Sequence, residues 1–118
     1  MSPYSEVVKQ HFANPRNMGP LRDADGVGEE GVAGRGNYVQ ISLRRGEGRI
    51  AEARFQSWGC PAIVATGSVL TEMLKGRTVA EALAITVDML ENALGPLPPS
   101  KRHCPEMALR ALHKALAT

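Results

Sequence analysis

The chain has 118 residues, of which 43% are hydrophobic and only 4% are aromatic. This length supports one hydrophobic core but not two ordinary domains, so we expect residues 1–118 to form a single domain. Lysine and arginine total 14 against 12 acidic residues, and the formal charge of +2 is dispersed. Dispersed charge offers no basic patch for nucleic acid, and no apolar run reaches the roughly 20 residues of a membrane helix. Since the start lacks a signal-peptide pattern, we expect a cytoplasmic protein that binds neither nucleic acid nor membrane.

The N-terminal part of the chain predicts a helix followed by irregular structure. The helix is predicted over residues 3–13, with Ser2 as its N-cap and Pro3 in its first turn. Residues 14–25 are rich in proline, glycine and aspartate, which favour a loop. Glycines recur between residues 26 and 36 and predict a brief strand around Val32-Ala33, followed by a flexible loop that approaches another part of the molecule closely.

A hairpin is predicted next. Val39, Ile41 and Leu43 alternate with polar residues, which is the period of a strand with one buried face. Residues 46–48 supply a turn, and residues 51–56 alternate in the same way, so the two strands should pair antiparallel.

The rest of the chain has helical periodicity. The predicted helices run from Cys60 to Lys75, from a capping box at Thr78 to Ile85, from Thr86 to Leu94, and from Cys104-Pro105 onwards. Residues 97–101 should be extended because proline disfavours a helix. Strands first and helices afterwards predict an α+β domain, with a small, mostly antiparallel three-stranded sheet packed against several helices.

The two cysteines share an unusual context, because each directly precedes a proline at the start of a predicted helix. Cys60 and Cys104 should therefore lie at helix N-termini, where free N–H groups and the helix dipole stabilise a thiolate. They are open to three interpretations, namely small buried hydrophobic residues, a disulfide, or two members of one site. His103 beside Cys104 adds an imidazole, and two thiolates with one imidazole suit zinc or part of an iron site.

Other residues with possible roles have simpler explanations. His103 is also consistent with a solvated loop residue, which is the more frequent state of a single histidine. We expect His11 and His113 to be solvated, since neither has supporting context. Trp58 should pack in the core at the junction between strand and helix.

Several segments together resemble one known family. They are Tyr4-Ser5-Glu6 with Asn14-Pro15-Arg16-Asn17, the stretch from Ala53-Arg54-Phe55 through Trp58-Gly59-Cys60, and Leu97-Pro98-Pro99-Ser100-Lys101 leading into His103-Cys104. In order and spacing they resemble the NifU amino-terminal domain or IscU type of iron-sulfur cluster assembly scaffold over nearly the whole chain. The resemblance implies a non-enzymatic scaffold or carrier for a [2Fe–2S] cluster or iron, with zinc possible in the isolated protein.

The resemblance also implies an assembly site of three cysteines, an aspartate and a histidine. Cys60 and Cys104 match the second and third cysteines and His103 matches the histidine, so these three are the expected metal ligands. Arg35 and Asn37 stand at the positions of the first cysteine and the aspartate. Arg35 cannot be a ligand because its guanidinium stays protonated, and it is otherwise a solvated loop residue, whereas Asn37 keeps an oxygen acceptor.

Two partners follow from the resemblance. A cysteine desulfurase would deliver sulfur to Cys104, and an Hsp70-type chaperone would bind residues 97–101, which are otherwise an ordinary linker. The alternative to a scaffold or carrier is a non-assembling paralogue. In that case Arg35 pairs with the thiolates, and the chain acts as an adaptor or regulator of the desulfurase or the chaperone.

Overall fold

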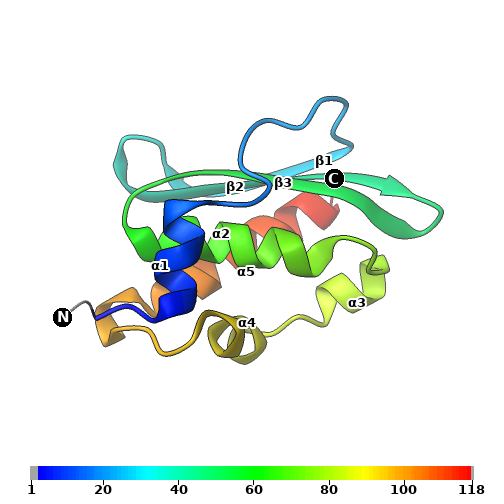
Figure 1. Cartoon of the computed structure of the whole chain (residues 1–118). Coiled ribbons are helices and arrows are strands. Elements are labelled where there is room, and N and C mark those ends of the chain that lie inside the picture. Colours follow the sequence, from blue (N-terminus) through cyan, green and yellow to red (C-terminus); the bar gives the residue numbers. More distant parts are fainter. Residues whose placement is uncertain (1–2, 118) are drawn as a thin grey trace.

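The computed structural model describes residues 3–117, which contain a three-stranded antiparallel sheet in the order β1-β2-β3 (Figure 1). The strands are β1 (Gly26–Val32), β2 (Arg35–Gly46) and β3 (Arg49–Trp58). The predicted α+β fold is therefore confirmed. The predicted brief strand was placed too late, because pairing already begins at Gly26 opposite Leu43. The expected flexible loop is a tight turn at residues 33–34, after which β2 starts.

Alternation along the hairpin places one face of the sheet in the core. Ile41 pairs with Phe55 and Leu43 pairs with Ala53, and all four are 0% exposed. The intervening residues lie on the opposite face, as the sequence predicted. Burial of these apolar side chains is the main term that holds the hairpin against the helices.

Residues 3–117 also form five helices and a short 3₁₀ turn, which lie on one side of the sheet (Figure 1). They are α1 (Glu6–Ala13), α2 (Pro61–Leu74), α3 (Val79–Leu83), α4 (Val87–Leu94), η1 (Pro99–Lys101) and α5 (His103–Ala117). α2 and α5 cover one face of the sheet, with α5 against β1 and β2 and α2 against β3 (Figure 1). Within residues 3–117, no helix has both the length and the apolar character needed to cross a membrane.

Helix ends follow their capping residues, with some corrections. The predicted N-caps Thr78, in a capping box with Glu81, and Thr86 are confirmed. α3 ends at Leu83 rather than at Ile85. α1 begins three residues later than predicted, because the Ser5 hydroxyl accepts from the amide of Val8 and caps it there. The predicted cap Ser2 lies outside the described residues.

The segment predicted to be extended is only partly so. Pro98 is extended, but residues 99–101 form η1, in which the Lys101 amide donates to the Pro98 carbonyl. Proline has no N–H but its fixed φ suits the first position of a helical turn, so it started a turn here instead of preventing one.

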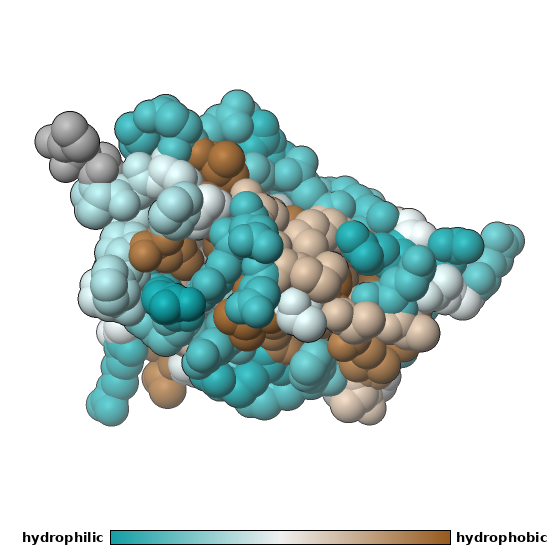
Figure 2. All heavy atoms as spheres, turned by 90° about the horizontal axis from the view of Figure 1, so that it is seen from below, coloured by the Kyte–Doolittle hydropathy of each residue, from teal (hydrophilic) through white to brown (hydrophobic). Residues whose placement is uncertain are grey.

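The helical side of the molecule exposes apolar side chains in patches that hydrophilic residues interrupt (Figure 2). Large exposed hydrophobic residues on these helices are Val7, Phe12, Leu83 and Met89. Scattered exposed apolar residues are normal on a soluble surface and identify no binding face by themselves.

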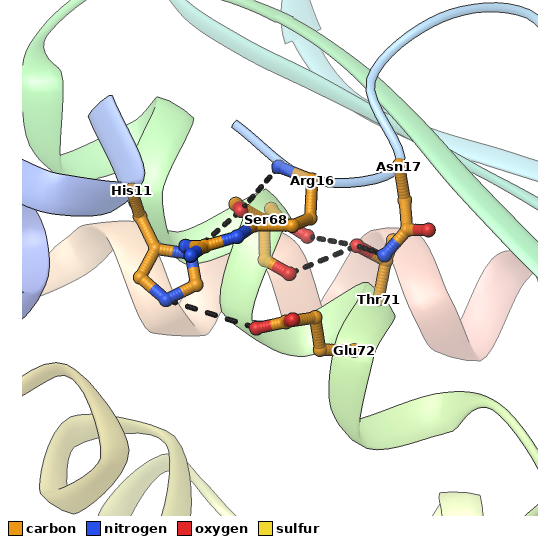
Figure 3. Close-up of polar contacts among 7 residues, drawn as sticks. His11, Arg16, Asn17, Ser68, Thr71 and Glu72 are labelled. Carbon is orange, nitrogen blue, oxygen red and sulfur yellow. Dashed lines mark hydrogen bonds and ion pairs between the residues drawn. The ribbon is translucent and has the colours of Figure 1, made fainter. Parts of the chain in front are cut away.

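His11 is buried, which corrects the prediction that it is solvated. It is 7% exposed, and its Nδ1 lies 2.7 Å from Ser68 Oγ and 3.2 Å from Arg16 Nη1 (Figure 3). Since Arg16 can only donate, Nδ1 is the acceptor and the neutral ring carries its proton on Nε2, which faces Glu72 at 3.7 Å. Ser68 Oγ also accepts from the Arg16 amide, and thus joins the loop after α1 to α2.

This environment makes stability depend on pH. Burial, and then the charge of Arg16, lower the pKa of His11 below 6.5, while Glu72 opposes them. As pH falls, His11 in the unfolded chain is therefore protonated before His11 in the folded chain, which favours unfolding. The stability that the neutral, buried His11 contributes is complete above about pH 6.5 and is lost as pH falls from there through the folded pKa. We expect His11→Asn, which keeps an acceptor but cannot titrate, to flatten the acid side of a pH series of urea unfolding free energies. His113→Asn, at an exposed site, is the control, and an unchanged slope in His11→Asn would contradict this explanation.

Candidate functional site

The two cysteines meet at one end of the sheet although they come from different elements. Cys60 is the N-cap of α2 with Pro61 in its first turn, as predicted. Cys104 lies in the first turn of α5, but the helix starts at His103, one residue before the predicted start. The two Sγ atoms are 3.9 Å apart and both cysteines are free, so the prediction of one shared site is the interpretation that the geometry supports.

Exposure differs between the members of this site. Cys104 is 0% exposed, Cys60 is half-buried and His103 is exposed. His103 Nε2 lies 3.9 Å from Cys104 Sγ, so the imidazole stands at the solvent side of the sulfur pair.

Asn37 lies at the centre of these groups and orients them. Its Oδ1 accepts from the Cys60 amide at 3.0 Å, which fixes the amide group so that Nδ2 faces the site. Nδ2 lies 3.4 Å from Cys60 Sγ, 3.5 Å from Cys104 Sγ and 3.1 Å from His103 Nε2. The sequence predicted an oxygen acceptor here, but that oxygen is already used by the backbone. Asn37 presents an N–H donor, which binds thiolates and not cations.

The two cysteine thiols have very different pKa values. The hydrogen bond from Cys104 lowers the pKa of the Cys60 thiol to about 4, with burial opposing and with further hydrogen bonds from the Ile63 amide and Asn37 assisting. The same contact, together with burial and the negative charge of Cys60, raises the pKa of Cys104. Cys60 is therefore the thiolate of the pair and Cys104 the thiol that donates to it.

Trp58 departs from expectation, whereas Arg35 is solvated, which is one of its two predicted states. Trp58, the last residue of β3, pairs with Tyr38 on the face of the sheet away from the helices and is 59% exposed rather than in the core. Arg35 is exposed at the start of β2, and among residues 3–117 no group forms a hydrogen bond or ion pair with its guanidinium. The bond from Arg35 to the thiolates that the adaptor alternative requires is thus not formed in this structure.

The donor set suits a soft or borderline metal, but the side chains are not yet arranged around one. In the part of the chain that the structure describes, no three His, Cys, Asp or Glu side chains form a ready-made metal site. Two sulfurs bound to one zinc ion lie about 3.8 Å apart, close to the separation seen here. The Asn37 amide nitrogen lies within 3.5 Å of all three donor atoms, so it occupies space that an ion bound by Cys60, Cys104 and His103 would need.

The segment before the site is accessible. Pro99 and Ser100 are exposed, whereas Leu97, Pro98 and Lys101 are half-buried. Beside Leu97 a hollow of about 250 Å³ is lined by Glu91, Asn92, Gly95, Pro96 and Leu97. Neither cysteine nor His103 lines the hollow, so it is separate from the cysteine site.

The fold is thus a three-stranded antiparallel sheet covered on one face by helices, with two cysteines and a histidine at helix N-termini. Comparison with known proteins identifies the family of domains to which it belongs. The family described as NifU-like N terminal domain matches residues 3–118, and the chain belongs to that family. The predicted resemblance to NifU and IscU scaffolds is therefore confirmed.

Individual relatives agree with this family. The chain is 47% identical over 113 residues to iron-sulfur cluster assembly scaffold protein IscU 1 of Archaeoglobus fulgidus, covering 96% of this chain and 74% of that protein. It is 37% identical to the IscU scaffold of Haemophilus influenzae, covering 97% and 93%. The crystal structure of an iron-sulfur cluster assembly scaffold protein for the SUF system from Fervidobacterium islandicum superposes with a TM-score of 0.77 at 24% identity, covering 96% of both chains. That last likeness supports the fold.

Proposed function

We propose that the chain is a scaffold or carrier in iron-sulfur cluster assembly that holds iron, zinc or a [2Fe–2S] cluster as cargo through Cys60, Cys104 and His103. The observation that carries the proposal is the convergence of these three side chains from two separate helix N-termini, with the sulfurs 3.9 Å apart. Relatives with up to 47% identity are named as such scaffolds.

The ligand set is smaller than a cluster requires. A [2Fe–2S] cluster takes a full set of thiolates, and this chain offers two thiolates and one imidazole. The missing ligands come from a partner, a second copy or added thiol, which favours a carrier that exchanges its cargo readily. Asn37 supports this by competing with the cargo for the thiolates, since its N–H group binds them when no cation is present.

A zinc titration tests the ligand set. We expect the chain to bind zinc far more tightly than 1 mM and the Cys60→Ser variant to lose on the order of a hundredfold in affinity, because a thiolate ligand is removed. Competition with a chromophoric chelator gives both constants. His113→Ala is the control, since this exposed histidine lies outside the site. Affinity near 1 mM in the unaltered chain would rule out the proposal and favour the adaptor alternative.

A cysteine desulfurase is the proposed sulfur donor. The exposure of the two cysteines makes Cys60 the accessible acceptor, because Cys104, which the sequence favoured, is enclosed. Incubation with a desulfurase and free cysteine should deliver sulfur to the chain, either as an adduct or as released sulfide. Absence of both would count against this partner.

An Hsp70-type chaperone is the second proposed partner, at residues 97–101. An extended peptide in a chaperone groove is bound through its backbone, so η1 must open on binding. We expect Pro99→Ala, at an exposed residue, to weaken stimulation of the chaperone's ATP hydrolysis several-fold, while Glu106→Ala, exposed on α5, leaves it unchanged. Equal stimulation by both variants would exclude this segment as the binding site.

A further inference from the structure

The sulfur pair has features that metal binding alone does not require. Cys60 is reachable from solvent, whereas Cys104 is 0% exposed and lies directly behind it with Sγ 3.9 Å away. The chain contains only these two cysteines, so a disulfide within it has one possible pairing. An accessible thiol backed by an enclosed one is the arrangement of an attacking and a resolving cysteine.

We infer that this pair converts the sulfane sulfur of a persulfide into sulfide. The inference rests on the proposed function for its purpose, since cluster assembly consumes sulfide, but its chemistry needs no metal. In the first step the Cys60 thiolate attacks the outer sulfur of a donor persulfide, forms Cys60–S–S⁻ and releases the donor as a thiol.

In the second step Cys104 attacks Cys60 Sγ. The Cys60–Cys104 bond forms and the bond between Cys60 Sγ and the outer sulfur breaks, so Cys60–S–S⁻ and Cys104–SH give the disulfide and HS⁻. The Cys104 proton leaves with the outer sulfur. Two cysteine sulfurs lose two electrons in total and the sulfane sulfur gains them, so the step is balanced without an external reductant.

The geometry selects release over onward transfer of the sulfur. Cys104 Sγ faces the Sγ atom of Cys60, which becomes the inner sulfur of the persulfide, and displacement there expels HS⁻. The outer sulfur should lie on the solvent side of Cys60, because Cys104 is enclosed on the other side. Attacking and leaving sulfurs therefore lie on opposite sides of Cys60 Sγ. Asn37 Nδ2 lies within 3.5 Å of both cysteine sulfurs and is a positioning group. Its N–H group can donate a hydrogen bond to whichever sulfur carries negative charge during the reaction.

The closure that the disulfide needs is small. A disulfide bond is about 2.05 Å long, so the two sulfurs must approach by roughly 1.9 Å. Both cysteines lie at helix ends, where side-chain rotation requires no rearrangement of a helix interior. A thiol reductant then reduces the disulfide back to two thiols. Each round of reduction therefore allows the release of one sulfide.

The test uses reduced, metal-free chain in EDTA with one equivalent of glutathione persulfide. We expect about one equivalent of sulfide above a donor-only control, trapped with monobromobimane, and a non-reduced intact mass about 2 Da lower, from a Cys60–Cys104 disulfide. Cys104→Ser should instead keep an adduct of about 32 Da on Cys60 and release no extra sulfide. Cys60→Ser should do neither.

Two results would overturn the inference. One is an unaltered chain that keeps the adduct and forms no disulfide, and the other is a Cys104→Ser variant that releases as much sulfide as the unaltered chain. Because Cys104 is buried, Cys104→Ala and a thermal melt of each variant check folding, and the measurement on the unaltered chain depends on no variant.

This test is independent of metal binding, because EDTA keeps the chain free of metal. A chain that binds zinc but releases no sulfide would lose only this inference, and one that releases sulfide but binds no metal would lose only the proposed function.

Discussion

Asn37→Asp is expected to tighten zinc binding by an order of magnitude or more. The substitution keeps the acceptor for the Cys60 amide but replaces the N–H donor at the centre of the site by a carboxylate oxygen. One added negative charge about 4 Å from a divalent cation is worth roughly 2 kcal/mol even in water, which exceeds tenfold in affinity. The same chelator competition measures the change.

The control for net charge is Ala51→Glu, at an exposed position beside the hairpin turn, at the opposite end of β3 from Cys60. It should leave zinc affinity within about twofold, since a distant surface charge is screened. If Asn37→Asp bound zinc no better than the unaltered chain, Asn37 would not be the group that keeps the apo site from closing.

Gly28→Ala should destabilise the fold strongly, although the substitution adds only one methyl group. A Cβ at Gly28 would overlap the Ala111 carbonyl and the Ala115 amide, which are backbone atoms of α5 and cannot rotate away. Since α5 must shift, we expect a loss of about 2–3 kcal/mol in unfolding free energy and a melting temperature roughly 10 °C lower. Urea and thermal unfolding measure both.

Gly46→Ala is the matched control, because its Cβ would meet only Ala51 Cβ at 3.6 Å. Its effect should stay below about 1 kcal/mol. Similar stabilities of the two variants would mean that α5 does not pack on β1 as closely as described. Because α5 also carries His103 and Cys104, Gly28→Ala should weaken zinc binding as well.

The sequence predicted those parts of the fold that depend on local chemistry. The hairpin came from alternation at Val39, Ile41 and Leu43, and the helix starts at Thr78 and Thr86 came from side chains that cap their own helices. Cys60 was placed correctly because proline at the next position marks a helix start whatever the tertiary structure.

What the sequence missed depends on contacts between distant residues. His11 is buried because Ser68, 57 positions away, supplies its hydrogen-bond partner, and no pattern around His11 indicates this. The orientation of Asn37 depends on the Cys60 amide, and the exposure of Trp58 depends on strand register. The donor role of Asn37 could be predicted only if Asn37 were known to face the backbone N–H of Cys60. That contact follows from the pairing of β2 with the end of β3, which the local sequence does not reveal.

The most direct test of the central claim is anaerobic reconstitution of the purified chain with iron and sulfide, followed by iron and sulfide analysis and a visible spectrum. We expect a coloured protein that carries a cluster, and loss of colour and of bound iron in both Cys60→Ser and Cys104→Ser. A colourless chain that retains neither iron nor zinc would contradict it, and would leave a NifU-family domain that works through its partners without holding a cluster.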